Sequence, residues 1–276
     1  MRASRALAVT ALAAVAVAAF LLLRDSGPAD PRGATVERIE IESEAVGRTQ
    51  PVSVVVPPGI PDRGRPALVF LHARGRDDES ELDDAFFAAL AGLGERALVV
   101  AFPDGGGSSY WHDRDSGAWG TYVTEEVIGE LVRRFEVDPG RIAVGGISMG
   151  GFGAFDLARL HPGRFCAAGG HSPALWASAG ETAEDAFDDS DDFARHDVVG
   201  AARTDPGAFA GTRLWLDIGE DDPFVRGADA FLEALGSGGV EVTARRWPGE
   251  HDDAYWDQHW DEYLRFYARA LARCGR

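Results

Sequence analysis

Lysine is absent from this chain of 276 residues, and all 27 basic residues are arginines. We interpret this as a coding bias toward GC-rich DNA rather than as a functional signal. Cysteine is scarce: Cys166 and Cys274 are the only two, and they lack C-x-x-C spacing. The sequence therefore predicts neither a thiol redox motif nor a zinc site, and it implies no cofactor or metal. The two cysteines could form one disulfide in an exported protein, or they could remain free thiols.

Positive charge is outweighed by negative charge. The chain has 45 acidic residues and a net charge of −18. Such acidity disfavours binding to nucleic acid and to anionic membrane surfaces. The sequence also has no internal repeat and no D-x-D-x-D-G calcium loop. A binding protein of these classes is therefore disfavoured.

The spacing of apolar residues indicates a single α/β domain over residues 34–276. From residue 67 onward, apolar strand runs alternate with segments of helical spacing, which predicts a mostly parallel sheet with helices on both faces. Thr35–Ala45 and Gln50–Val56 instead alternate polar and apolar residues. They predict an antiparallel hairpin at one edge of that sheet.

Residues 1–33 are predicted to lie outside this domain. Arg2 and Arg5 precede an apolar run, Ala6–Leu23, as in an export signal. Its eighteen residues would just cross a bilayer, so the segment is either a cleaved signal or an uncleaved anchor. Both alternatives predict an exported protein, extracellular or held at the outer face of the membrane by this segment alone.

The most informative motif is Gly146-Ile147-Ser148-Met149-Gly150. It follows an apolar run, 141–145, and precedes a segment of helical spacing, Phe152–Leu160. Strand, glycine-flanked serine and helix together indicate a nucleophile elbow, in which Ser148 occupies a strained turn. Ser148 is therefore the predicted nucleophile.

An acid and a base follow in the order that this architecture requires. Residues 213–218 read as a buried strand, and Asp221 and Asp222 come directly after it. We predict Asp222 as the acid, with Asp221 as the alternative; one of the two is expected to cap a helix at Pro223–Leu235. His251 follows the predicted strand Val240–Arg246 and is the predicted base.

Two backbone N–H groups are predicted to receive an oxyanion. One belongs to Met149, the first residue after the nucleophile, where helical N–H groups are free. The other belongs to Arg74, in the loop after the strand 67–71. His72 in the same loop is expected to be structural, because a second base has no task here.

A glycine- and aromatic-rich loop follows the strand 97–102. Its Tyr110 and Trp111, together with Trp119, either wall the substrate pocket or pack beneath the loop. His171 ends another strand at the same edge and is a further pocket candidate, with a structural role as the alternative. The acidic stretch 181–192 is either a lid or a solvated excursion of the surface.

Five segments give the chain its resemblance to a known family: Leu68–His72, Phe102–Gly106, Gly145–Gly151, His171–Leu175 and Pro248–Trp256. The chain resembles the putative-esterase group of α/β-hydrolases, which includes esterase D (S-formylglutathione hydrolase), tributyrin and feruloyl esterases, and the antigen 85 mycolyltransferases. The resemblance implies Ser148, Asp222 and His251 as a catalytic triad. It departs at Ala73, where such families usually carry glycine.

The sequence thus predicts a serine carboxylic-ester hydrolase that acts through an acyl-enzyme on a small-molecule ester. An acyltransferase that passes the acyl group to a sugar hydroxyl is the alternative. A non-catalytic domain on the same scaffold would be expected to lack one member of the triad.

Overall fold

The computed structural model describes residues 29–274, within which a compact unit begins at Pro31. The predicted export segment at residues 1–33 lies almost wholly outside the described residues. Across residues 29–274 no helix has the length and apolar character needed to span a bilayer.

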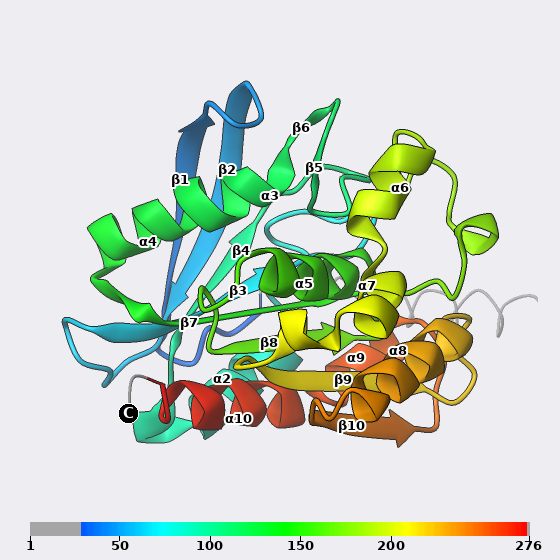
Figure 1. Cartoon of the computed structure of the whole chain (residues 1–276). Coiled ribbons are helices and arrows are strands. Elements are labelled where there is room, and N and C mark those ends of the chain that lie inside the picture. The colour runs from blue at the N-terminus through cyan, green and yellow to red at the C-terminus, as the bar shows by residue number, and fades with distance from the viewer. Residues whose placement is uncertain (1–28, 275–276) are drawn as a thin grey trace, which may run out of the picture. The chain divides into compact units, whose positions relative to one another are not determined.

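An eight-stranded sheet forms the centre of this unit (Figure 1). Its strand order is β1-β2-β4-β3-β7-β8-β9-β10. The strands are β1 (Thr35–Ser43), β2 (Arg48–Val56), β3 (Arg65–Leu71), β4 (Val99–Pro103), β7 (Val137–Ile147), β8 (Ala167–His171), β9 (Arg213–Gly219) and β10 (Val242–Trp247). A separate two-stranded ribbon pairs β5 (Asp113–Arg114) with β6 (Gly117–Ala118).

The sheet is mostly parallel, as predicted. Strand β1 pairs antiparallel with β2, and β2 pairs antiparallel with β4, whereas every pair from β4 to β10 is parallel. The predicted hairpin at the sheet edge is therefore confirmed. Because parallel strands point the same way, the residues after β7, β9 and β10 all emerge at one edge of the sheet.

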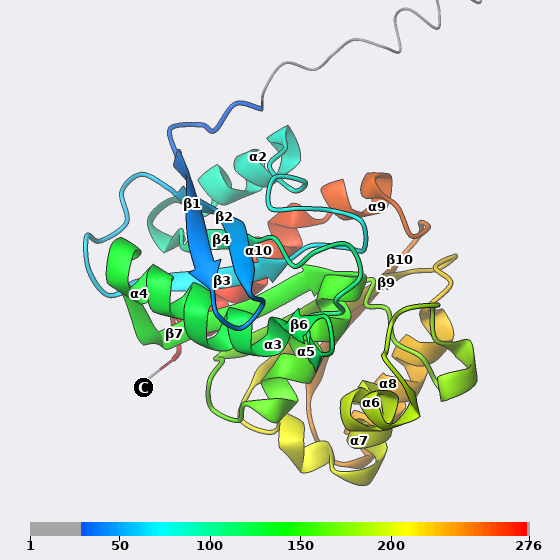
Figure 2. The same ribbon diagram turned by 90° about the horizontal axis from the view of Figure 1, so that it is seen from above.

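Helices cover both faces of the sheet (Figure 2). Helices α2 and α10 lie on one face, and α4, α5, α7 and α8 lie on the other. The helices are α2 (Asp84–Gly92), α3 (Trp119–Thr121), α4 (Ile128–Phe135), α5 (Met149–Leu160), α6 (Ser190–His196), α7 (Val198–Thr204), α8 (Val225–Ser237), α9 (Asp253–Asp257) and α10 (Trp260–Leu271). A π-helical turn, Tyr122–Val127, joins α3 to α4.

Burial on both faces explains why the central strands read as continuous apolar runs. Residues 67–71 of β3 and all five residues of β4 are buried. Most of β7 is buried too, apart from residues 138–141, which are exposed or half-buried. Strand β10 is different: it is the last strand of the sheet, and its residues are exposed or half-buried.

A disulfide joins Cys166 to Cys274, with 6.0 Å between their Cα atoms. Cys166 directly precedes β8, and Cys274 follows α10. The bond therefore ties the C-terminal helix to the start of a central strand. A disulfide is consistent with export to an oxidising compartment.

Candidate active site

Ser148 lies at a sharp turn between β7 and α5. Its backbone has φ 54° and ψ −111°, a conformation that costs a non-glycine residue about 1–3 kcal/mol. A Cβ at Gly150 would lie 1.9 Å from the carbonyl oxygen of Leu71, and a Cβ at Gly146 would lie 2.5 Å from the same oxygen. Only glycine fits at these two positions, which explains the G-x-S-x-G pattern.

Asp222 follows β9, and its side chain is fully buried. One carboxylate oxygen accepts a hydrogen bond from the N–H of Phe224 at 2.8 Å, and the other faces His251. Asp221 is exposed to solvent instead. Neither carboxylate caps the next helix, contrary to our expectation, because α8 begins only at Val225 and its N-cap is Phe224.

His251 bridges the acid and the serine. Its Nδ1 lies 2.7 Å from Oδ2 of Asp222, and its Nε2 lies 2.9 Å from Oγ of Ser148. The loops after β9 and β10 are bonded to each other, since Glu220 N–H donates to Trp247 O and Asp221 N–H donates to Gly249 O. The structure thus brings the three predicted side chains into one hydrogen-bonded chain that can move a proton from a hydroxyl to an imidazole.

The two predicted oxyanion donors lie in segments that meet beside Ser148. Met149 is the first residue of α5, so its N–H has no intrahelical acceptor. The strand that leads to Arg74 ends at Leu71, whose carbonyl abuts the first turn of α5. Among residues 29–274, no hydrogen bond is donated by the N–H of Arg74. His72 is held by Ala73 O at 2.8 Å and by the N–H of Gly105 at 2.9 Å, which suits the structural role expected for it.

Two aromatic rings that were not among the predicted site residues pack on His251. Phe224 and Trp256 each have a ring centroid 5.1 Å from that of His251. Trp176 packs on Phe224 at 6.1 Å. Phe224 and Trp256 stand within five residues of Asp222 and His251 in the chain, and this proximity was the available signal. Aromatic side chains therefore lie directly beside the imidazole of the predicted base.

The predicted pocket aromatics are almost completely buried. Trp111 is fully buried, packs against His72 and donates from Nε1 to the carbonyl of His72. Tyr110 is 3% exposed and packs on Phe152 and Trp176. Both therefore act as packing residues beneath the loop, the second of the two alternatives. Burial also raises the pKa of the Tyr110 hydroxyl.

Trp119 has a mixed position. It is only 3% exposed, and the guanidinium of Arg48 lies 5.1 Å above its ring. Its edge nevertheless lines a cavity of about 260 Å³ beside the glycine loop 105–107. Trp119 thus borders a cavity, which agrees with a role as a pocket wall. Ser148, however, is not among the residues that line this cavity.

Of the two roles considered for His171, the structure supports the structural one and not the pocket, because His171 is completely buried. Its Nδ1 lies 2.7 Å from Oδ1 of Asp217, and its Nε2 lies 2.9 Å from the hydroxyl of Tyr267. Asp217 also accepts hydrogen bonds from Trp215, Tyr255 and Tyr263. This network extends to the site through the backbone, since the carbonyl of His171 accepts from the N–H of Ser148 at 3.0 Å.

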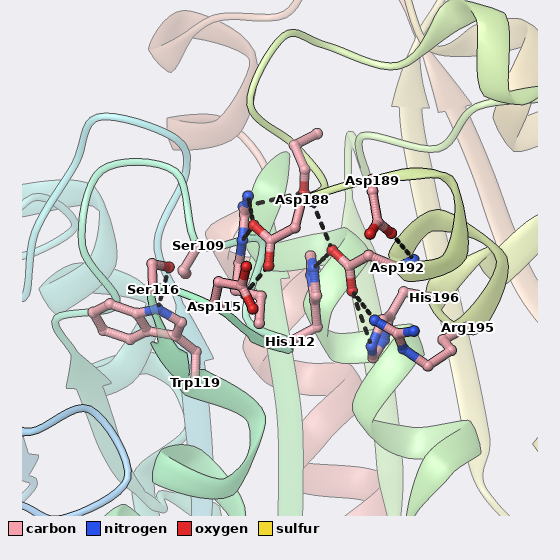
Figure 3. A network of polar contacts seen from close by, with 12 residues as sticks. Ser109, His112, Asp115, Ser116, Trp119, Asp188, Asp189, Asp192, Arg195 and His196 are labelled. Carbon is pink, nitrogen blue, oxygen red and sulfur yellow. Dashed lines mark hydrogen bonds and ion pairs between the residues drawn. The ribbon is translucent and has the colours of Figure 1, made fainter.

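The acidic stretch 181–192 is fastened to the molecule by its own carboxylates (Figure 3). Asp188 pairs with Arg114 and accepts from the N–H of Asp115. Asp192 is buried and lies 3.1 Å from Nε2 of His112. Burial, with the neighbouring His196, lowers the pKa of His112. The stretch is therefore anchored through Asp188 and Asp192, while most of its acidic residues are exposed to solvent.

Carboxylates also gather where the loop after β3 meets the loop after β10. Arg76 pairs with Asp253, two residues beyond His251. Glu81 is buried nearby, and burial, with Asp253, Asp83 and Asp257 around it, raises its pKa to about 7. Burial and Asp83 likewise raise the pKa of Asp257 to about 6.

Glu81→Gln is expected to stabilise the protein at pH 8 by about 2–3 kcal/mol. A carboxyl whose pKa is raised from 4.5 to about 7 stabilises the fold fully below pH 4.5, and this contribution is lost as pH rises through 7. The gain from glutamine should therefore shrink to below ~1 kcal/mol at pH 4.5. Urea unfolding at the two pH values measures it, with the exposed Glu79→Gln as control. Equal gains at both pH values would contradict the assignment.

Known proteins match most of this chain in sequence. MPT51 antigen of Mycobacterium leprae is 32% identical over 190 residues, which are 63% of this chain and 57% of that protein. Mycolyltransferase Ag85A of Mycobacterium gordonae is 27% identical over 266 residues, covering 81% of this chain and 77% of the relative. Esterase Rv1288 of Mycobacterium tuberculosis is 25% identical, covering 84% and 58%. The chain thus spans under three fifths of MPT51 antigen and of Esterase Rv1288.

Solved structures share the fold. A ferulic acid esterase superposes with a TM-score of 0.76 at 19% identity, over 86% of this chain and 98% of its own. An S-formylglutathione hydrolase from Agrobacterium tumefaciens superposes with a TM-score of 0.75 at 21% identity, over 87% and 96%. These likenesses show the α/β-hydrolase fold. A sequence model of the family described as "Putative esterase" matches residues 43–267, and the chain therefore belongs to this esterase family of α/β-hydrolases.

Proposed function

We propose that the protein is a serine carboxylic-ester hydrolase that acts on a small-molecule ester. The observation that carries the proposal is the continuous chain from Ser148 Oγ to His251 and on to Asp222, with contacts of 2.9 and 2.7 Å. The names of esterases among its relatives support the same reaction class.

In the first half of the reaction, Oγ of Ser148 attacks the ester carbonyl carbon. The hydroxyl proton passes to Nε2 of His251, and the N–H groups of Met149 and Arg74 receive the developing oxyanion. Asp222 accepts the Nδ1–H bond, which fixes the imidazole tautomer and stabilises its charged form. His251 then gives the proton to the leaving alkoxide, and the alcohol departs from an acyl-enzyme.

In the second half, a water molecule takes the place of the alcohol. His251 removes its proton, the hydroxide adds to the acyl carbon, and collapse of the intermediate returns the proton to Ser148 and releases the acid. Both halves require Nε2 of His251 as the proton acceptor. The machinery uses only side chains and backbone of this chain.

Acyl transfer to a sugar hydroxyl is the second candidate, and one relative's name, mycolyltransferase Ag85A, favours it. The two reactions share the acyl-enzyme and differ only in which hydroxyl reaches it. Phe224 and Trp256 pack on His251, and Trp176 packs on Phe224, so apolar side chains adjoin the position from which either acceptor would attack.

Competition between water and a sugar for the acyl group distinguishes hydrolysis from acyl transfer. We expect p-nitrophenyl esters from acetate to palmitate to be cleaved, with free acid as the main product even when ~50 mM trehalose, roughly a thousandth of the molarity of water, is present. An acyl-sugar that exceeds free acid would assign the protein to acyl transfer. No cleavage of any ester in the panel would contradict both candidates.

A further inference from the structure

A groove far from Ser148 collects positive charge on this acidic protein. It consists of two adjoining cavities of about 780 and 290 Å³, which share Arg213, Thr243, Phe266 and Arg273 in their linings. The groove lies where β9 and β10 face α10, whose Phe266 packs on Trp215 with ring centroids 5.3 Å apart. Arg213 begins β9 and Asp222 follows its end, so about 20 Å of strand separates the groove from the proposed acid.

Five arginines line the groove, against two glutamates, Glu241 and Glu262. They are Arg213, Arg245, Arg265, Arg269 and Arg273. Carboxylates outnumber arginines in this chain of net charge −18, yet most arginines of the groove form no ion pair within the described residues.

Three of the five have no ion pair within residues 29–274: Arg213, Arg269 and Arg273. Arg245 lies over the ring of Trp215 at 5.5 Å, and its guanidinium bonds only to the carbonyl of Ala244. Arg265 alone pairs with a carboxylate, that of Asp261. Guanidinium groups gathered in a concave site without counter-charges attract anions, and their planar forks suit the oxygens of carboxylate, sulfate or phosphate.

We propose that this groove binds a linear acidic glycan, with its anionic groups on the arginines and its sugar rings along the half-buried face of Phe266. Two adjoining cavities flanked by strand and helix have room for a slender chain, and their shared lining residues make one continuous groove. The disulfide between Cys166 and Cys274, whose second cysteine directly follows Arg273, is consistent with an oxidising compartment outside the cytoplasm, where acidic glycans rather than nucleic acids are the common polyanions.

Binding of a fluorescent heparin-derived hexasaccharide to the full chain tests the proposal by anisotropy. The test variant is Arg269→Gln/Arg273→Gln, both residues being exposed. The control is Arg133→Gln/Arg134→Gln on α4, which makes the same change in net charge at arginines that pair with Glu130. We expect the groove variant to lose affinity at least tenfold, with a salt slope lower by about 2, and the control to change less than threefold.

Both variants should keep the wild-type thermal midpoint and the wild-type rate of ester cleavage, because neither pair contacts Ser148 or His251. Equal losses in the two double variants would overturn the proposal, since binding would then follow net charge alone. Binding of the hexasaccharide is compared with binding of two other polyanions. These are a single-stranded oligonucleotide of equal charge and vesicles of phosphatidylcholine with phosphatidylglycerol. Tighter, Arg269- and Arg273-dependent binding of either would also overturn it. Failure of ester cleavage in the wild type would leave this result unaffected.

Discussion

Ser148→Ala is expected to lower kcat/KM for p-nitrophenyl acetate by a factor of about 10⁴ or more. The hydroxyl is the only group at the end of the proposed relay that can form the acyl-enzyme, and alanine cannot replace it. The substitution leaves the backbone strain at φ 54° unchanged, since alanine and serine both carry a Cβ. The unfolding midpoint should therefore move little, and kinetics measured beside a thermal melt separate lost chemistry from lost fold.

Asp222→Asn with Asp221→Asn as its matched control tests the second contact of the relay. The two substitutions make the same charge change at adjacent residues, but only Asp222 contacts His251, at 2.7 Å, and Asp221 is exposed. An asparagine at 222 can present an N–H to Nδ1 and so favour the wrong tautomer, which lowers kcat by about 10³–10⁴. The control should retain most of its activity. Similar losses in both variants would contradict the role of Asp222.

Asp217→Ala is expected to destabilise the protein by about 3–5 kcal/mol, the largest loss of stability that we predict. Both carboxylate oxygens of Asp217 accept two hydrogen bonds: one takes His171 Nδ1 and Trp215 Nε1, and the other takes the hydroxyls of Tyr255 and Tyr263. Burial, together with the nearby Asp217, raises the pKa of both tyrosines, so their hydroxyls remain donors. Removing the carboxylate leaves four buried donors without an acceptor.

Urea unfolding of Asp217→Ala, with the exposed Glu220→Gln as control, measures this loss. The loss of stability in Asp217→Asn should lie between those of the two other variants. The amide keeps one acceptor oxygen, but its N–H group faces two donors. A destabilisation below ~1 kcal/mol in the alanine variant would show that the network matters little to the fold. Activity per folded molecule should change less than for Asp222→Asn, since Asp217 reaches Ser148 only through the backbone.

The elbow and the ends of the parallel strands were predictable because their signals are local. Glycines at 146 and 150 are required by contacts with one carbonyl, that of Leu71, and any helix that turns this sharply from a strand imposes them. Strands that are buried on both faces leave continuous apolar runs, and residues directly after them fall at one edge. Asp222 and His251 could therefore be placed together although 29 residues separate them.

The direction of a side chain was not predictable in the same way, because it depends on segments distant in the sequence. Tyr110 points into the core through contacts with Phe152 and Trp176, and His171 turns inward because Asp217 and Tyr267 offer it partners. The sequence shows only that aromatic and imidazole side chains stand near the sheet edge. The carboxylates were misjudged for a related reason: α8 begins two residues later than the pattern indicated, and neither carboxylate caps it.

The arginine groove also escaped sequence analysis. Its five arginines lie on β9, β10, α10 and the residues after it, between positions 213 and 273. The net charge describes the whole chain and does not reveal that one groove of this acidic protein is positively charged. Only the packing of α10 against the last strands of the sheet brings these residues into one groove.

Covalent trapping can identify the nucleophile of this protein without any knowledge of its substrate. The protein is incubated with a fluorophosphonate, which reacts with activated serines, and is then digested and analysed by mass spectrometry. We predict a single phosphonyl adduct on Ser148, absent from Ser148→Ala and formed much more slowly in His251→Ala. An adduct on another residue, or equal labelling of wild type and Ser148→Ala, would contradict the assignment of Ser148 as the nucleophile.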